Sequence, residues 1–365
     1  MIKHVKVLLG IISRKIIPNI VYLIIRNFTG KPIDTAPFGD LKIAFIRPGK
    51  LGDLIVATPF FSALKKKYPG IYIAVICSPY NKIIVQHNPY VNFLKVVNFH
   101  SFGDVLKVIG WIRRNQFDWV VDLTPGVSRT STLISRLIRS AKTHTAGMHK
   151  AQSSRYFDVV TDYHGIHIID RIKLLIENVL HCKFDEPLHS EVYFLEEHKE
   201  NARRLLTKND SAKMLIGVNL SAGENERLWS REKYRDLILM INRKFNTVQI
   251  VLFSMGEQQK WAQEYALEMD YVVALPSVDL LTITAAIGHL SLFFSPDTSL
   301  LHIAAGLSIP VVGLYCTDGE NLIRWRAYGH GSKELVARET NNVNEISVQR
   351  AFGALVELIE CNERT

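Results

Sequence analysis

Short, continuous runs of apolar residues recur along the chain from residue 41 onward. They span 41–46, 71–76, 119–121, 214–220, 248–253, 271–274, 291–295 and 311–315. Runs of this kind, without polar alternation, are typical of strands that are buried on both faces. Segments with helical spacing lie between them, at 52–67, 102–115, 128–139, 230–244, 257–268, 279–288 and 298–306. Because strands alternate with helices in both halves, the pattern predicts an α/β protein with two Rossmann-like domains, each a parallel sheet covered by helices.

The length of the chain, 365 residues, suits two domains of ordinary size. A polar passage at 184–191, which contains a proline, separates the two alternating halves. We therefore expect an N-terminal domain over 37–190 and a C-terminal domain over 191–345. Outside them lie a basic segment at 1–36 and a C-terminal helix within 346–365, a candidate for packing back on the N-terminal domain.

The composition narrows the class of protein. Hydrophobic residues make up 47% and charged residues 22% of the chain, which argues against a disordered or low-complexity protein. The four cysteines lie far apart without a C-x-x-C pair, so the sequence indicates neither a zinc ribbon nor a disulfide framework. A reducing compartment is therefore expected.

The first 36 residues are basic and amphipathic. They hold six Lys and Arg against one Asp, a local charge of +5 in a chain of net charge +9. Arg14, Lys15 and Pro18 interrupt the apolar runs, whereas a membrane span needs about 20 continuous apolar residues. Wound as a helix, the segment has an apolar face and a basic face, which is typical of a helix lying in a membrane interface. The alternative is that the apolar face packs on the protein's own body.

A second basic stretch, 123–157, holds six Lys and Arg and no Asp or Glu. Such a block suits an anionic partner. Nucleic acid is disfavoured because no aromatic stacking platform or helix-turn-helix pattern accompanies the charges. Two interpretations stay open: a binding region for a phosphorylated acceptor, to which Arg129 and Arg136 would contribute, or a solvated basic face.

The first loop of chemical interest is residues 47–53, because ligands of open parallel sheets bind beyond the carboxyl ends of the strands. Gly49 and Gly52 let its backbone turn tightly and approach a ligand. Asp53 follows where a helix begins, and is either a functional carboxylate or simply the helix N-cap. The loop lacks the G-x-G-x-x-G pattern of dinucleotide-binding domains.

The second loop is residues 295–299, between a strand and a helix. Asp297, Thr298 and Ser299 gather hydroxyls and backbone N–H groups at a helix N-terminus, which is a ready site for a diphosphate. Asp297 suits such a site if it holds the loop or contacts a sugar hydroxyl. His302, one helical turn further on, either reaches a phosphate or the cap, or packs in the core.

Three groups of residues together resemble glycosyltransferase family 9, the family of ADP-heptose:lipopolysaccharide heptosyltransferases. They are the loop 47–53 followed by Thr58-Pro59, the stretch 219–223 leading to Arg227-Leu228-Trp229, and Asp297-Thr298 with His302 and 310–312. The matches keep their order and spacing over about residues 41–330. The resemblance implies the GT-B fold, in which two Rossmann-like domains with parallel sheets face an interdomain cleft. The acceptor would lie mainly on the first domain and the nucleotide sugar mainly on the second.

The resemblance also implies roles for individual residues. Asp53 occupies the position of the catalytic base, and the candidates for acceptor binding are Arg47, Lys50, Arg129 and Arg136. The candidate donor-binding residues are Ala222, Gly223, Arg227, Glu257, Asp297, Thr298, Ser299 and His302. Arg227 stands where the family usually has Lys, and Ser299 where many members have Gly. The loop 276–279 is a candidate contact for adenine.

No metal and no other cofactor is expected. The sequence has no D-x-D triad, and His164 and His167 have no third ligand in view,. A cation and a helix N-terminus are therefore expected to stabilise the departing nucleoside diphosphate.

The resemblance implies an inverting, metal-independent transfer of heptose from ADP-heptose to a lipid-linked, phosphorylated lipopolysaccharide or lipooligosaccharide inner-core acceptor. The enzyme would be cytoplasmic, and segment 1–36 would attach it to the anionic inner face of the inner membrane. One alternative is the same fold with another nucleotide-sugar donor. Another is a catalytically silent, membrane-bound assembly partner, against which the presence of both Asp53 and Asp297 argues.

Overall fold

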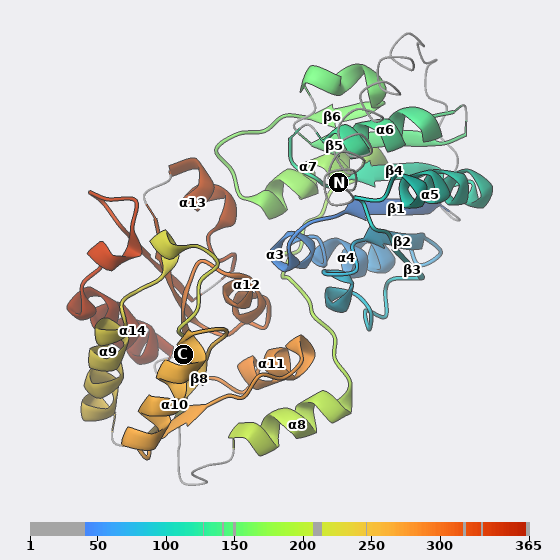
Figure 1. Ribbon diagram of the computed structural model, residues 1–365. Coiled ribbons are helices and arrows are strands. Elements are labelled where there is room, and N and C mark those ends of the chain that lie inside the picture. The colour runs from blue at the N-terminus through green and yellow to red at the C-terminus, as the bar shows by residue number, and fades with distance from the viewer. Residues whose placement is uncertain are drawn as a thin grey trace, which may run out of the picture. The chain divides into compact units, whose positions relative to one another are not determined.

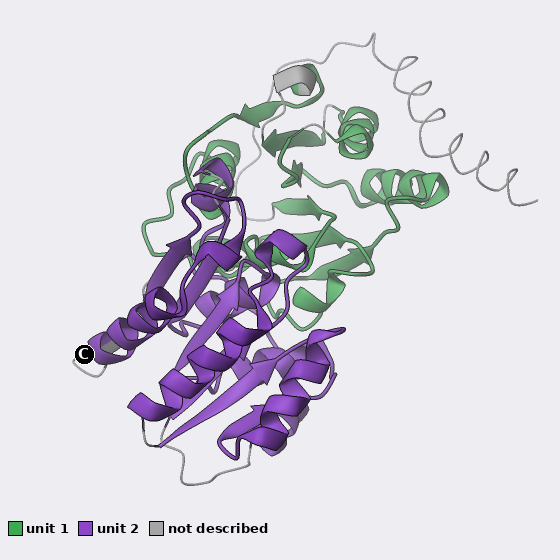
Figure 2. Cartoon of the chain, turned by 60° about the vertical axis from the view of Figure 1, so that its left-hand side comes forward, with its two compact units in different colours: residues 1–188 green, residues 189–365 purple. Residues whose placement is uncertain are grey.

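The chain divides into two compact units, 1–188 and 189–365 (Figure 2), whereas we expected the boundary between 190 and 191. The computed structural model describes residues 41–126, 128–140, 142–148, 151–206, 214–245, 247–316, 319–329 and 331–362. The basic segment 1–36 lies outside the described residues.

Unit 1 is a six-stranded parallel sheet in the order β3-β2-β1-β4-β5-β6 (Figure 1). Its strands are β1 Lys42–Arg47, β2 Tyr72–Cys77, β3 Phe93–Val96, β4 Trp119–Asp122, β5 His144–Met148 and β6 Val159–Thr161. Its helices are α3 Leu51–Ile55, α4 Pro59–Lys67, α5 Phe102–Asn115, α6 Arg129–Ile138 and α7 Ile168–Leu180. The central strands are buried along nearly their whole length, as expected for a sheet covered on both faces.

The helix that the sequence predicts over 52–67 is in fact two helices, α3 and α4. Pro59 is the first residue of α4, where its missing N–H costs no helical hydrogen bond and its fixed φ suits a helix start. Thr58 lies between the helices and donates its hydroxyl to the carbonyl of Ile55 at 2.7 Å. The break leaves α3 as a helix of only five residues at the end of β1.

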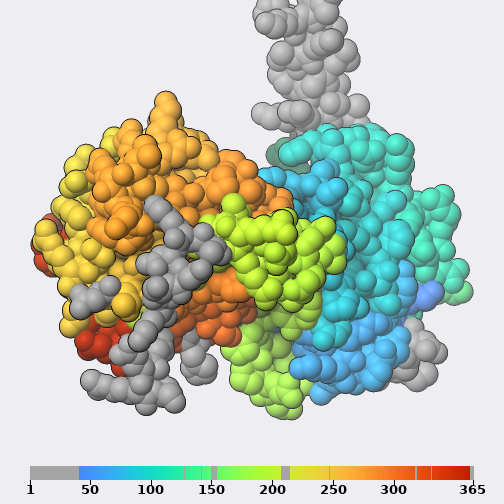
Figure 3. All heavy atoms as spheres, turned by 90° about the horizontal axis from the view of Figure 1, so that it is seen from below, coloured from blue at the N-terminus to red at the C-terminus, as the bar shows by residue number. Residues whose placement is uncertain are grey.

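Unit 2 is a second six-stranded parallel sheet, in the order β12-β11-β10-β7-β8-β9. Its strands are β7 Met214–Asn219, β8 Val248–Phe253, β9 Val272–Ala274, β10 Leu292–Pro296, β11 Val311–Tyr315 and β12 Ser332–Val336. Its helices are α8 Glu196–Leu206, α9 Arg231–Lys244, α10 Gln258–Glu268, α11 Leu280–Ile287, α12 Ser299–Gly306, α13 Gly319–Trp325 and α14 Val348–Asn362. Figure 3 shows α8, in yellow-green, on the surface of the molecule, and α8 packs against α11.

The C-terminal helix α14 packs on the second sheet of its own unit. It contacts α9 and strands β10, β11 and β12. Val348, Ala351 and Leu355 join the same buried cluster as the core of the second sheet. The indole of Trp229 donates to the carbonyl of Ile346 at 3.0 Å, so the loop after β7 is tied to the segment that leads into α14.

None of the helices in the described part of the chain is long and apolar enough to cross a bilayer.

The segment between β12 and α14 is organised by one carboxylate. Glu345 accepts the backbone N–H groups of Arg338, Glu339 and Thr340 at 2.6, 2.8 and 2.8 Å. These bonds favour the charged form and lower the pKa of Glu345 from 4.5 to about 2,. The stabilisation is therefore fully present above the ordinary pKa and is lost as the pH falls toward about 2,.

We expect the Glu345→Gln variant to unfold at a lower urea concentration than the wild type at neutral pH. The difference in midpoint should shrink as the pH is lowered below the ordinary pKa of 4.5, because the carboxylate of the unfolded chain is then protonated while that of the folded protein keeps its charge down to about pH 2,. The Glu200→Gln variant is the control, since it removes only an exposed ion pair with Arg204 in α8 and should change the midpoint little. Equal midpoints for Glu345→Gln and wild type at neutral pH would contradict the assignment.

Candidate active site

The loop after β1 presents Asp53 at the third residue of α3. Its Oδ2 accepts the backbone N–H of Lys50 at 2.8 Å, and its Oδ1 lies 3.2 Å from Nη2 of Arg47. Lys50 is the N-cap residue of α3, so Asp53 is not the helix N-cap. The Asp53 side chain is 25% exposed, which leaves the carboxylate accessible to a ligand.

Gly49 is required by this arrangement. Its φ of +121° lies where only glycine is comfortable, and a Cβ at this position would lie 2.5 Å from Oδ2 of Asp53,. A side chain at position 49 would displace the Asp53 carboxylate, so glycine is needed there.

Arg47 does not line the surface, contrary to the expectation that it binds the acceptor. Its side chain is 1% exposed. Its Nε donates to the carbonyl of Asp53 at 2.7 Å, and Nη1 donates to the carbonyl of Leu123, in the loop after β4. Burial lowers the pKa of Arg47, and the nearby carboxylates of Asp53 and Asp122 oppose that shift,. All three nitrogens of the guanidinium therefore contact groups of the protein itself.

The other three candidates for acceptor binding lie in different places. Lys50 is exposed beside Asp53, and Arg129 is exposed at the first residue of α6, just beyond the carboxyl end of β4. Arg136 belongs to the last turn of α6, about 10 Å further along the helix axis. Its guanidinium lies 5.7 Å from the centre of the Tyr156 ring. The structure thus brings Lys50 to the Asp53 loop but places Arg136 at the other end of its helix.

Two residues of unit 1 belong to this edge and were not identified from the sequence. Asn81 is buried after β2, and its Nδ2 donates to the carbonyl of Arg47 at 3.0 Å. Asp122 is buried at the end of β4, and its Oδ1 accepts the N–H of Thr124 at 2.9 Å. A polar residue at the end of a buried strand, or a few residues after it, was the available signal, because neighbouring parallel strands end at the same edge of a sheet.

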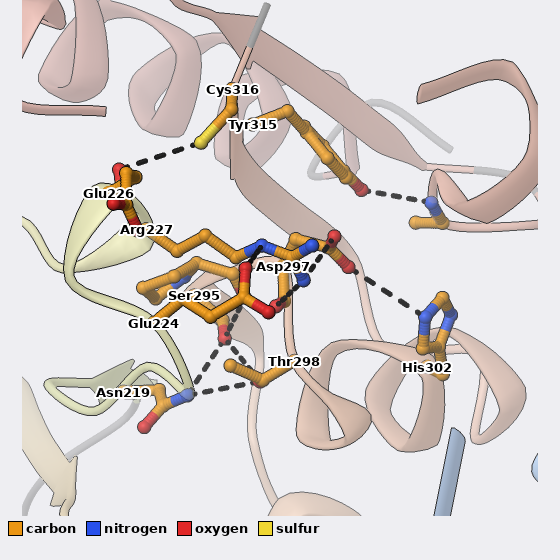
Figure 4. A network of polar contacts seen from close by, with 12 residues as sticks. Asn219, Glu224, Glu226, Arg227, Ser295, Asp297, Thr298, His302, Tyr315 and Cys316 are labelled. Atoms are coloured by element: carbon orange, nitrogen blue, oxygen red, sulfur yellow. Dashed lines mark hydrogen bonds and ion pairs between the residues drawn. The ribbon is translucent and has the colours of Figure 1, made fainter. Parts of the chain in front are cut away.

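The corresponding edge of unit 2 is built from the loops after β7 and β10, which are neighbouring strands. Nη1 of Arg227 lies 3.0 Å from Oδ2 of Asp297, and Nε lies 3.3 Å from Oε2 of Glu224 (Figure 4). Asp297 is anchored in turn, because its backbone N–H donates to the carbonyl of Leu314 at 3.0 Å. The loops thereby hold a cation at the carboxyl edge of the sheet.

Thr298 begins helix α12 without capping it through its side chain. Its hydroxyl instead lies 3.2 Å from Nδ2 of Asn219 and 3.2 Å from the hydroxyl of Ser295 (Figure 4). Asn219 also donates to Ser295 at 3.0 Å. Because the hydroxyl is turned away from the first turn, the backbone N–H groups there suit an anion. Asn219 is the last residue of β7 and Ser295 lies in β10. The sequence motifs at 219–223 and 295–299 include both residues, but neither was assigned a role in the site.

His302 combines the two interpretations that the sequence left open. It is 7% exposed, and its ring makes an edge contact with Trp325 at 6.2 Å. Its Nε2 also lies 3.9 Å from Oδ1 of Asp297. The imidazole is therefore largely buried and at the same time faces the carboxylate of the site.

The remaining candidates for donor binding lie at the same edge. Ala222 is half-buried and Gly223 exposed in the loop after β7, Ser299 is half-buried at the first residue of α12, and Glu257 is exposed just before α10. The hydroxyl of Ser221 accepts the N–H of Met255 at 2.7 Å, which ties the loops after β7 and β8 together. Asp279, by contrast, caps α11 by accepting the N–H groups of Leu281 and Thr282, each at 3.0 Å.

Within the residues that the structure describes, no group of three or more His, Cys, Asp and Glu side chains could hold a metal ion.

Comparisons with known proteins agree with this architecture. A family model described as glycosyltransferase family 9 (heptosyltransferase) matches residues 105–355. The chain belongs to glycosyltransferase family 9. The matched residues include the whole Arg227–Asp297 edge of unit 2 and begin after the Asp53 loop. As a member of this family, the protein is a glycosyltransferase.

Individual relatives of this family-9 protein are distant. Lipopolysaccharide heptosyltransferase 3 of Escherichia coli strain K12 is 23% identical over 289 residues, which cover 76% of this chain and 82% of that protein. The crystal structure of the glycosyl transferase family 9 from Veillonella parvula has a TM-score of 0.76 at 20% identity and covers 90% of this chain and 99% of that one. The structure of E. coli heptosyltransferase WaaC with ADP has a TM-score of 0.71 at 17% identity, covering 87% and 100%. These structures confirm the predicted GT-B fold with two parallel sheets.

Proposed function

We propose that this family-9 glycosyltransferase moves a heptose from ADP-heptose to a lipid-linked, phosphorylated inner-core acceptor of lipopolysaccharide or lipooligosaccharide, with inversion and without a metal. Unit 2 would hold the donor, and unit 1 would supply the base. The observation that carries the proposal is the cation of Arg227, fixed by Asp297 beside the start of α12.

A nucleoside diphosphate matches this edge of unit 2 in charge and in hydrogen-bonding groups. The guanidinium and the backbone N–H groups of the first turn of α12 are donors for phosphate oxygens, and Thr298 lies directly before that turn. The names of the relatives supply the sugar and the nucleotide. One relative is a lipopolysaccharide heptosyltransferase, and one structural neighbour is a heptosyltransferase with ADP.

The proposed reaction is a single displacement. Asp53 takes the proton from the acceptor hydroxyl as its oxygen forms a bond to the anomeric carbon. The bond from that carbon to the diphosphate oxygen breaks, and the departing diphosphate gains negative charge. Arg227 and the start of α12 stabilise that charge in the transition state, which is the role of preorganised donors at a leaving group.

We further propose that the enzyme works on the inner face of the cytoplasmic membrane, attached through segment 1–36. The support is the sequence of that segment, with its local charge of +5 and its apolar face. An acceptor with a lipid part would stay in the bilayer, so attachment would bring the enzyme to it.

The Asp53→Ala variant tests the base. Wild-type protein should turn over ADP-heptose and a delipidated inner-core acceptor, and the variant should lose about 10²- to 10⁴-fold in kcat, the usual contribution of general-base catalysis. Asp104→Ala is a matched control, because Asp104 follows a glycine at the third position of α5 as Asp53 does in α3. It should turn over like the wild type. A near-normal kcat for Asp53→Ala would remove Asp53 from the mechanism.

The Arg227→Ala variant tests the donor site. It should bind ADP about 10- to 100-fold more weakly, since a charged hydrogen bond is worth about 1.5–3 kcal/mol, while adenosine binding should change little. Calorimetry with both ligands measures the difference. Arg235→Ala, which breaks an ion pair with Glu268 on the outer face of α9, is the control. Equal losses for ADP and adenosine would assign Arg227 to packing instead.

Deleting residues 1–36 tests the membrane attachment. Each basic residue near an anionic surface is worth about 1 kcal/mol, so the full chain should co-sediment with anionic vesicles in a salt-sensitive manner. The truncated protein should lose this binding and keep its turnover on a soluble acceptor. Unchanged vesicle binding would point to the basic stretch 123–157, and unfolding of the truncated protein would show that the segment packs on the domain.

A further inference from the structure

The buried guanidinium of Arg47 holds Asp53 from two directions. Nε donates to the backbone carbonyl of Asp53 at 2.7 Å, and Nη2 lies 3.2 Å from its carboxylate. Nη1 donates to the carbonyl of Leu123, which directly follows the neighbouring strand β4. One side chain thus joins the ends of β1 and β4 to both the backbone and the side chain of Asp53.

The loop contributes one hydrogen bond to this carboxylate, from the backbone N–H of Lys50 at 2.8 Å, but the loop has little rigidity of its own. Helix α3 has only five residues, and so short a helix has little stability of its own. The residues before it, Gly49 and Lys50, are exposed. The orientation of Asp53 therefore depends on contacts with the sheet beneath it, and Arg47 provides them.

A second layer holds Arg47 itself. Asn81, fully buried after β2, donates from Nδ2 to the carbonyl of Arg47 at 3.0 Å. The Oδ1 of the same amide accepts the N–H and the hydroxyl of Ser78, both at 2.9 Å. The support of Asp53 therefore runs through the carboxyl ends of three neighbouring strands, β2, β1 and β4.

A buried charge is a poor way to gain stability, because its desolvation offsets most of the attraction to its partner. What a buried arginine does provide is fixed geometry, since its planar fork sets the direction of each hydrogen bond. With Arg47 on Oδ1 and the Lys50 N–H on Oδ2, each oxygen retains a second lone pair for a substrate hydroxyl. The contacts from Arg47 and Lys50 thus orient the carboxylate and leave it accessible to a substrate.

We propose that Arg47 is a positioning residue for Asp53 and makes no contact with the acceptor. The inference rests on the proposed role of Asp53 as the base. It assigns to Arg47 a contribution to kcat that acts only through the Asp53 carboxylate.

The Arg47→Lys variant tests the proposal, because it keeps the charge and removes the fork. Misplacing a reacting group by about 1 Å can cost about 100-fold, and we expect kcat to fall about 10- to 100-fold. The KM for the acceptor and the affinity for ADP should stay within about threefold of the wild type, since no ground-state contact is removed. Thermal unfolding and circular dichroism establish the folded fraction, to which each kcat is normalised.

A double-mutant cycle separates positioning from a general structural effect. In the Asp53→Ala background, Arg47→Lys should lower kcat by less than about twofold, because residues that act as one unit are not additive. Arg139→Lys is the control, because Arg139 pairs with Asp158 at 2.5 Å at the far end of α6. The decrease in kcat that this substitution causes should be equally small in the wild-type and Asp53→Ala backgrounds.

Three results would overturn the proposal. If the losses multiply in the double variant, Arg47 acts independently of Asp53. A raised acceptor KM with unchanged kcat would make Arg47 an acceptor contact. A near-normal kcat for Asp53→Ala alone would show that Asp53 is not the base. The proposed mechanism and the positioning role of Arg47 would then both fail. Should Arg47→Lys not fold, Asn81→Ser replaces it in the same cycle, with a fall of about 3- to 10-fold expected from the more distant contact.

Discussion

Each sheet of this protein is parallel and covered by helices on both faces, and this constraint decides where charge can lie. The strands β1, β2 and β8 are buried over almost their entire length, so they leave little room for solvated side chains. Polar groups collect where parallel strands end, at one edge of each sheet. Asp53 and Asp122 lie at that edge in unit 1, and Arg227 and Asp297 lie there in unit 2.

The two arginines at these edges illustrate different uses of the same side chain. Arg47 is buried, and its donors go to Asp53 and Leu123. Arg227 is 31% exposed and is held by carboxylates on two loops, so a more highly charged diphosphate can compete for it. The first suits a supporting role beneath a reactive group, and the second suits direct contact with a ligand.

The sequence was sufficient for the elements that carry a local signal. The buried strands from β1 to β11 that read as continuous apolar runs were predicted within about two residues, the usual uncertainty of an element boundary. Strand β5 was not predicted, because its sequence HTAGM has no apolar run. Strands β3, β6 and β12 were also missed. They lie at sheet edges and are only partly buried, so they too lack a continuous apolar run. The break before Pro59 was missed because the helical spacing continues through it.

The site was predictable where its residues are neighbours in sequence. The group of Asp297, Thr298 and His302 lies within one loop and one helical turn, so the motif alone brings it together. The place of Arg47 depends on the carbonyl of Leu123, and that of Asn219 on Ser295, each 76 residues away in sequence. A single sequence does not reveal such pairs, and for this reason Arg47 was assigned to the acceptor and Asn219 was given no role in the site.

The central claim is that the edge of unit 2 binds ADP-heptose for transfer to an inner-core acceptor. It is tested most directly by incubating the purified full-length protein and a delipidated inner-core acceptor with ADP-heptose, or with UDP- and GDP-linked sugars in parallel, and measuring the mass of the acceptor. The account predicts an acceptor heavier by one heptose, with release of ADP, only in the reaction that contains ADP-heptose. A product formed from a UDP- or GDP-linked sugar but not from ADP-heptose would contradict it.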